Sequence, residues 1–203
     1  MADDIQVRLS AEWGAAVASG RTPEIAGVRA AAAPELASRA AAVAELEETR
    51  LLVAGLRESL ETRRDEQRLV TRQWTIRDVV GHLASWARET RCEIETLGRG
   101  QTFDYTIHFE REGGPRAWNQ REIDARVGRS VWQLFDEFDA ETSRLAELAV
   151  SLSEDEFQGR MELPRTSGEP PSPWRLGLAP LLVQTCWHVR YHLTAIERAR
   201  SRA

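Results

Sequence analysis

Lysine is missing from this 203-residue sequence, and all 27 basic residues are arginine. A GC-rich genome accounts for such a bias, because arginine codons are GC-rich and lysine codons are not. The arginines are interspersed with carboxylates and the formal net charge is −5, so the chain lacks the basic face of a nucleic-acid-binding protein. We therefore expect no nucleic-acid partner.

Cysteine is scarce as well. Cys92 and Cys186 are too few and too far apart for a disulfide framework or a cysteine zinc site. The sequence also lacks an apolar run long enough to cross a bilayer, and its first residues, MADDIQVRLS, lack the basic-then-apolar order of a secretory signal. These absences predict a cytoplasmic protein with no membrane partner.

The remaining composition is that of a soluble globular protein, with 42% hydrophobic and 29% charged residues. Residues 1–38 differ from the rest, because Pro23, Pro34, glycines and alanine runs interrupt any sustained period. We interpret this segment as an N-terminal extension, partly helical. Residues 39–203 are predicted to form the folded domain.

Within the domain, apolar residues recur at helical spacing and no stretch shows sustained strand alternation. Capping boxes mark two helix starts, Thr75 with Asp78 and Ser130 with Gln133. The expected helices are a first at about 40–65, a second from about 76, a short one at 115–127, a third after Ser130 and a last one that begins at Pro180. The prediction is an all-α four-helix bundle with long crossover connections.

The last helix carries two histidines, in the stretch PLLVQTCWHVRYHLTAIERAR. Residues four apart lie on one helix face, so His188 and His192 can direct two imidazoles at one ion. The line Leu181, Thr185, His188, His192, Ala195, Ala199 is predicted to be the core-facing seam. A second interpretation is that each histidine is a buried residue bonded to a carbonyl or carboxylate. The pair alone leaves both open.

A third histidine favours metal. His82 lies at the edge of the apolar stripe of the second helix, and three neutral imidazoles plus water form an open, catalytic-type zinc site. Nickel also suits imidazole ligands. Val189 stands where a metalloprotease of the HExxH type has its glutamate, which argues against peptide hydrolysis. The fourth histidine, His108, is expected in a loop.

Three segments together resemble the DinB-like four-helix-bundle metalloprotein superfamily. They are WTIRDVVGHLASWARE, SVWQLFDEFDAETSRLAELAVSLSEDEF and the terminal helix with HxxxH. The likeness covers roughly residues 40–200, and the first segment is most similar to the branch of the ClbS/DfsB-type proteins and the mycothiol-dependent maleylpyruvate isomerases. The resemblance implies that His82, His188 and His192 are the metal ligands.

Members of that superfamily include thiol-cofactor transferases, an isomerase and a hydrolase. The resemblance implies a divalent zinc or nickel ion that activates water or a low-molecular-weight thiol against an electrophilic small molecule, in detoxification or stress resistance. It also makes a homodimer an assembly to expect. The alternative is a non-catalytic bundle that binds a metal or a ligand.

Residues near the histidines are weaker candidates. Glu89 follows His82 by seven residues, so it shares nearly the same face and is the candidate base or outer-shell carboxylate, against the alternative of a solvated helix glutamate. Gln184, one turn before His188, is placed either to form a hydrogen bond with a metal-bound water or to lie at the edge of the core. Four tryptophans could wall a pocket or simply pack, namely Trp74, Trp86, Trp118 and Trp187.

Overall fold

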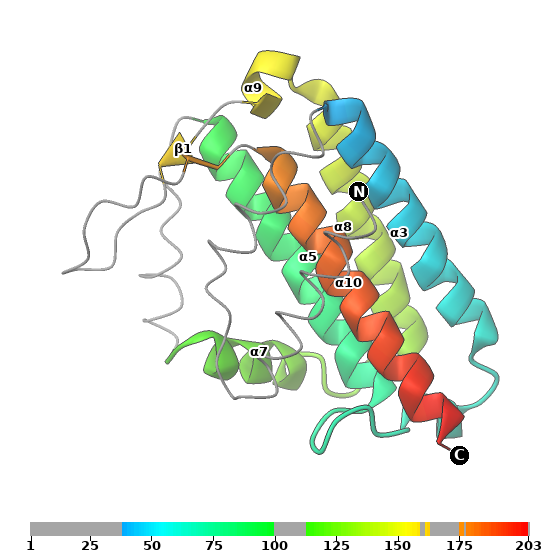
Figure 1. The fold of residues 1–203 in the computed structure, drawn as a ribbon. Coiled ribbons are helices and arrows are strands. Elements are labelled where there is room, and N and C mark those ends of the chain that lie inside the picture. The colour runs from blue at the N-terminus through cyan, green and yellow to red at the C-terminus, as the bar shows by residue number, and fades with distance from the viewer. Residues whose placement is uncertain (1–37, 100–112, 159–160, 163–174, 177, 203) are drawn as a thin grey trace.

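The computed structural model describes residues 38–99, 113–158, 161–162, 175–176 and 178–202. The long helices of this part are α3 (Arg39–Ser59), α5 (Ile76–Gly98), α8 (Val131–Ser151) and α10 (Leu178–Ser201), which lie side by side (Figure 1). The shorter ones are α4 (Arg63–Glu66), α7 (Pro115–Asp124) and α9 (Glu154–Gln158). The predicted all-α bundle is confirmed.

The direction of the helices explains why one connection is long. In Figure 1, α3 and α10 run one way and α5 and α8 the other. Arg200 near the end of α10 donates to Ser59 at the end of α3, and Arg39 at the start of α3 reaches the carbonyl of Leu152 after α8. Because α5 and α8 are parallel neighbours, the chain must return along the bundle between them, and α7 lies on this crossover.

Both predicted capping boxes are present. The Ser130 hydroxyl accepts from the amide of Gln133, whose side chain accepts from the amide of Ser130 at 2.9 Å. Asp78 accepts from the amide of Thr75 at 3.0 Å, and the hydroxyl of Thr75 accepts in return from the amide of Asp78. These bonds satisfy backbone amides that have no partner inside the helix. Because they require particular residue types three positions apart, the sequence predicted both helix starts.

The predicted bounds of two helices were wrong. The helix expected at 40–65 ends at Ser59, because Leu60 turns to an extended conformation and buries its side chain. Thr62 then caps a separate turn, α4, by a capping box with Asp65. The helix expected at 115–127 ends at Asp124, and Gly128, at φ +90°, takes a backbone conformation that helices do not contain.

The core forms two clusters along the bundle. One joins the start of α5 to the start of α8, and its members include Ile76, Leu83, Phe135, Phe138 and Ile196. The other joins the far ends of these helices to α9, and its members include Leu46, Ile94, Leu145, Phe157 and Leu182. Beside the first cluster, Gly81 leaves room for the side chain of Arg126, whose Cδ would lie 3.3 Å from a Cβ at this position.

The predicted seam of α10 is displaced. Four of the buried apolar side chains of this helix share one face, namely Leu182, Cys186, Val189 and Ile196. They lie beside the predicted line, on which His188 and His192 are half-buried at the edge of the core. The apolar surface of α10 is wide, so the spacing alone did not distinguish its core-facing centre from its edge.

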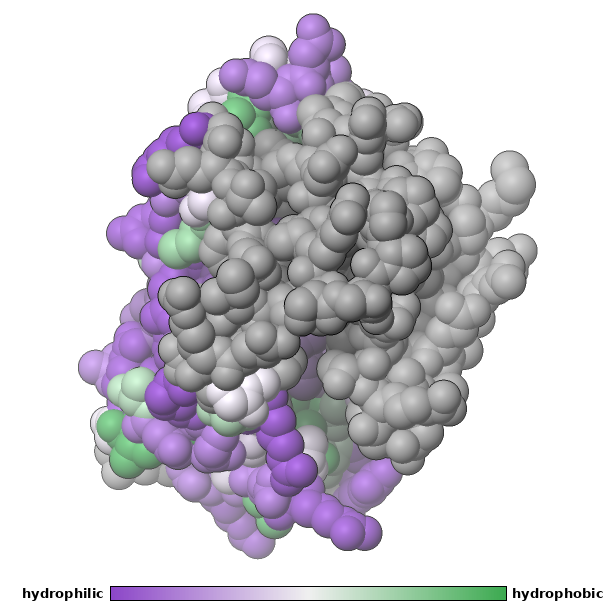
Figure 2. All heavy atoms as spheres, turned by 90° about the vertical axis from the view of Figure 1, so that its left-hand side faces the viewer, coloured by the Kyte–Doolittle hydropathy of each residue, from purple (hydrophilic) through white to green (hydrophobic). Residues whose placement is uncertain are grey.

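Outside the helices, Met161–Glu162 pairs antiparallel with Arg175–Leu176. A pairing of two residues per strand is too short to leave a period in the sequence. Within the described ranges, no helix has the length and hydropathy needed to cross a membrane. Figure 2 shows one face, on which hydrophilic side chains cover most of the described surface. Residues 1–37, most of the predicted extension, lie outside the described residues.

Candidate metal centre

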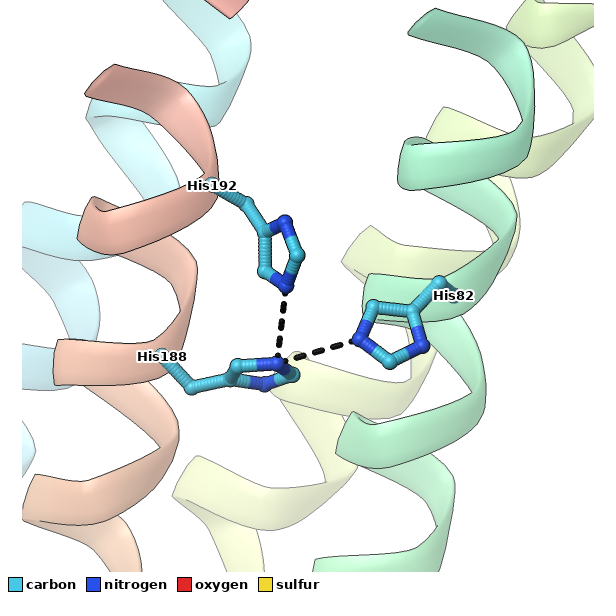
Figure 3. Close-up of side chains that lie close together, drawn as sticks. All are labelled: His82, His188 and His192. Atoms are coloured by element: carbon cyan, nitrogen blue, oxygen red, sulfur yellow. Dashed lines mark hydrogen bonds between the residues drawn. The ribbon is translucent and has the colours of Figure 1, made fainter. Parts of the chain in front are cut away.

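Two antiparallel helices bring the three histidines together. His82 comes from the second turn of α5, and His188 and His192 come from successive turns of α10. All three rings point toward one another (Figure 3). The hydroxyls of Thr90, about two turns after His82, and Thr185, about one turn before His188, lie 3.0 Å apart and join the same two helices through a buried hydrogen bond.

The contacts between the rings are made by one type of atom. Nε2 of His188 lies 3.1 Å from Nε2 of His82 and 3.0 Å from Nε2 of His192. One ring nitrogen from each of the three histidines lies within 4.8 Å of the corresponding nitrogens of the other two. Tetrahedral zinc with bonds of about 2.0–2.1 Å separates its ligand nitrogens by roughly 3.3 Å. The histidine spacing therefore fits one ion.

Hydrogen bonding alone does not satisfy this arrangement. Each imidazole nitrogen has a single in-plane position, which holds either a hydrogen or a lone pair. Nε2 of His188 has two short contacts, and hydrogen bonds can satisfy only one of them. A cation at the point where three lone pairs meet satisfies all three nitrogens, so the donor set matches a divalent metal better than a packed core.

The surroundings keep the imidazoles neutral, which is the form that binds metal. Burial lowers the pKa of His188 to about 4. Burial, followed by the positive charges that His192 and His188 would carry, holds the pKa of His82 well below its usual range. Burial and His188 do the same to the pKa of His192. All three imidazoles are therefore neutral at neutral pH, and each keeps one ring hydrogen.

Aromatic rings surround the cluster. The ring of Trp74 lies 4.9 Å from that of His82, centroid to centroid, and Trp86 lies 5.8 Å from His188 at a steep angle. On the α10 side, Tyr191 lies 5.2 Å from His192. These rings put low-polarity surface beside the site, and electrostatic interactions are stronger next to such surface than in water. Trp74 and Trp86 therefore lie next to the histidine cluster, with Tyr191 as an unpredicted neighbour.

The other predicted residues lie farther out. Trp118 contacts Trp86, and Trp187 stacks on Tyr191. Glu89 is a buried residue of α5, 7% exposed, which is not the solvated glutamate of the alternative interpretation. Its carboxylate is not among the atoms of the histidine cluster. The side chain of Gln184 and all of His108 lie outside the described residues.

Asn119 is a neighbour of the site that the sequence did not indicate. It lies on α7, and its Oδ1 accepts a hydrogen bond of 3.0 Å from Nε1 of Trp86. Asparagine in a short polar helix has no periodic signal, and only the docking of α7 on α5 brings it to this place. Tyr191 likewise gave no signal apart from its position beside His192.

The family model of the mycothiol maleylpyruvate isomerase N-terminal domain matches residues 44–179, more than half of the chain. The matched segment contains His82 and Glu89 and ends before His188 and His192. No curated protein and no solved structure matches the chain. The match agrees with the helical bundle and with the resemblance seen in the sequence. The chain therefore belongs to the family of the mycothiol maleylpyruvate isomerase N-terminal domain, within the DinB-like superfamily.

Proposed function

We propose that this protein is an enzyme that holds a divalent metal ion through Nε2 of His82, His188 and His192 and uses it to activate a low-molecular-weight thiol against an electrophilic small molecule. The observation that carries the proposal is the central nitrogen of His188. Its two contacts of 3.1 and 3.0 Å are not both satisfied by hydrogen bonds and are both satisfied by a shared ion.

An open coordination position supports catalysis over a purely structural ion. Among the residues that the structure describes, no fourth histidine, cysteine, aspartate or glutamate joins the cluster. Three protein ligands and one exchangeable position are typical of catalytic zinc, whereas structural sites have four protein ligands. When bound, such an ion lowers the pKa of a coordinated water or thiol and polarises a substrate oxygen.

The family name supports a thiol as the co-reactant, because mycothiol is a low-molecular-weight thiol. The side chains of this chain supply the rest of the site. The three histidines hold the ion, and the aromatic rings of Trp74, Trp86 and Tyr191 lie beside it. We assign to Glu89 the removal of the proton that the thiol loses. Attack by water in place of the thiol would use the same residues.

Turnover with and without thiol tests the proposal. The purified protein, loaded with zinc or nickel, is expected to consume an electrophile only when both the metal and mycothiol are present. Maleylpyruvate, named in the family description, is one test substrate, and a small epoxide or alkyl halide is another. Consumption with metal but without thiol would identify a hydrolase. The absence of turnover from the metal-loaded protein with every substrate would favour a non-catalytic, ligand-binding bundle.

The role of Glu89 is tested by Glu89→Gln. The amide keeps the shape of the side chain and removes the proton acceptor, so kcat is expected to fall roughly 100-fold or more, the usual contribution of general base catalysis. Metal content and the KM for the electrophile should change little. Glu95→Gln, on the same helix and paired with Arg91, is the matched control. Equal activity in the two variants would remove Glu89 from the mechanism.

A further inference from the structure

The second ring nitrogen of His82 is the starting point. Nδ1 of His82 is buried and has no hydrogen-bond partner of good geometry among the described residues. If Nε2 is to offer a lone pair to a metal, the ring hydrogen must sit on Nδ1. A ring nitrogen in that position nearly always donates to an acceptor, which fixes both the tautomer and the orientation of the ligand.

The hydrogen bond from the indole of Trp86 identifies which side-chain atom of Asn119 faces that ring. The indole nitrogen of Trp86 is only a donor, so the atom of Asn119 that lies 3.0 Å from it is the amide oxygen. A carbonyl oxygen has two lone pairs, and the indole occupies one. The other remains available to a second donor.

The position of His82 relative to this oxygen follows from the helix. His82 and Trp86 are four residues apart on α5 and therefore share a face. Their rings are 6.3 Å apart at an edge-on angle. The side chain of Asn119 also lies close enough to His82 to count as a side-chain hydrogen-bonding neighbour of that ring. The oxygen held by Trp86 is therefore within the reach of the His82 ring.

The segment that carries Asn119 is firmly attached to α5. Trp118 packs edge-on against Trp86 with ring centroids 5.1 Å apart. Arg88 of α5 pairs with Glu122 of α7 at 2.7 Å. These contacts fix the register between α7 and α5.

We infer that Asn119 is a positioning residue for the metal centre: its Oδ1, held by Trp86, receives the Nδ1 hydrogen of His82 and keeps Nε2 of that histidine free for the ion. The inference rests on the proposed function, because a positioning role for Asn119 requires that His82 binds a metal ion. The tautomer of His82 can nevertheless be measured in the metal-free protein, so the two can fail separately.

The tautomer is read by ¹⁵N NMR of the full-length metal-free protein at pH 7.5, with the His82 signals assigned by their loss in His82→Gln. The parent is expected to show hydrogen on Nδ1 of His82. Asn119→Leu removes the acceptor and should shift the population toward hydrogen on Nε2. Asn119→Asp offers a carboxylate to both donors and should keep the parent tautomer. Gln120→Leu, at an exposed site on the same helix, is the matched control.

Zinc affinity is the second readout. Asn119→Leu is expected to weaken zinc binding by roughly 10- to 100-fold, as the loss of a partner behind a metal ligand does. Asn119→Asp and Gln120→Leu should bind like the parent or, for the aspartate, more tightly. A His82 tautomer that is the same in the parent and Asn119→Leu would overturn the inference. A parent that binds no zinc but shows the Asn119-dependent tautomer would overturn the proposed function instead.

Discussion

Replacing His188 with glutamine is expected to abolish metal binding and, with it, all stabilisation that metal gives the protein. Glutamine keeps similar bulk and hydrogen-bonding capacity but removes the nitrogen that lies 3.1 and 3.0 Å from the other two. A ligand that binds only the folded state stabilises it by about 4 kcal/mol at a free concentration 1,000 times its Kd. For a chain of this size, that raises Tm by roughly 10 °C.

The metal-free forms separate this effect from packing. Without metal, the parent and His188→Gln should melt at similar temperatures, because no ion is lost, and only the loaded parent should melt higher. Thr194→Ala, at an exposed site on the same helix, is the control and should retain the full shift. Metal content and metal-dependent melting that survive in both His188→Gln and His192→Gln would rule out the three-histidine centre.

Local chemistry explains which parts of the fold could be predicted. The starts of α5 and α8 were predictable because each capping box joins two residues only three positions apart, Thr75 with Asp78 and Ser130 with Gln133. Both partners of each cap therefore lie within one helical turn of the sequence. The end of α3 was not, because it depends on whether Leu60 finds a place in the core. That outcome is decided by helices far away in the chain.

The same distinction applies to the site. His188 and His192 share a helix, so their spacing alone places them together. His82, 106 residues before His188, was indicated by its place at the edge of the apolar stripe of the second helix, and the resemblance then implied its role as a ligand. Asn119 reaches Trp86 across 33 residues and through the docking of a separate short helix, with no motif to mark it. Burial of Glu89 is likewise a tertiary property. Sequence reasoning therefore found the candidate ligands and missed the residue behind one of them.

Acidification is expected to destabilise the metal-free protein steeply between about pH 6.5 and pH 4. An unfolded histidine has a pKa near 6.5, whereas burial lowers the pKa of His188 to about 4 and those of His82 and His192 well below the usual value. Below pH 6.5 the unfolded chain binds protons that the folded protein does not. Stability is thus complete above the unfolded pKa and is lost as the pH falls toward the folded values.

The size of the loss follows from the number of histidines. Each contributes up to about 1.4 kcal/mol per pH unit in this window, and the three together about 4 kcal/mol per unit. Urea unfolding of the metal-free protein at pH 7.5 and 5.5 measures it, with the triple variant His82→Gln, His188→Gln, His192→Gln as the comparison. Burial raises the pKa values of Glu122 and Glu137, but their bonds with Arg126 and the other arginines nearby lower them by more. These two groups therefore add their own loss at lower pH in both proteins. The parent should lose several kcal/mol more than the triple variant between the two pH values. Equal losses would mean that the three imidazoles take up protons in the folded protein as readily as in the unfolded chain. That result would contradict their role as neutral ligands.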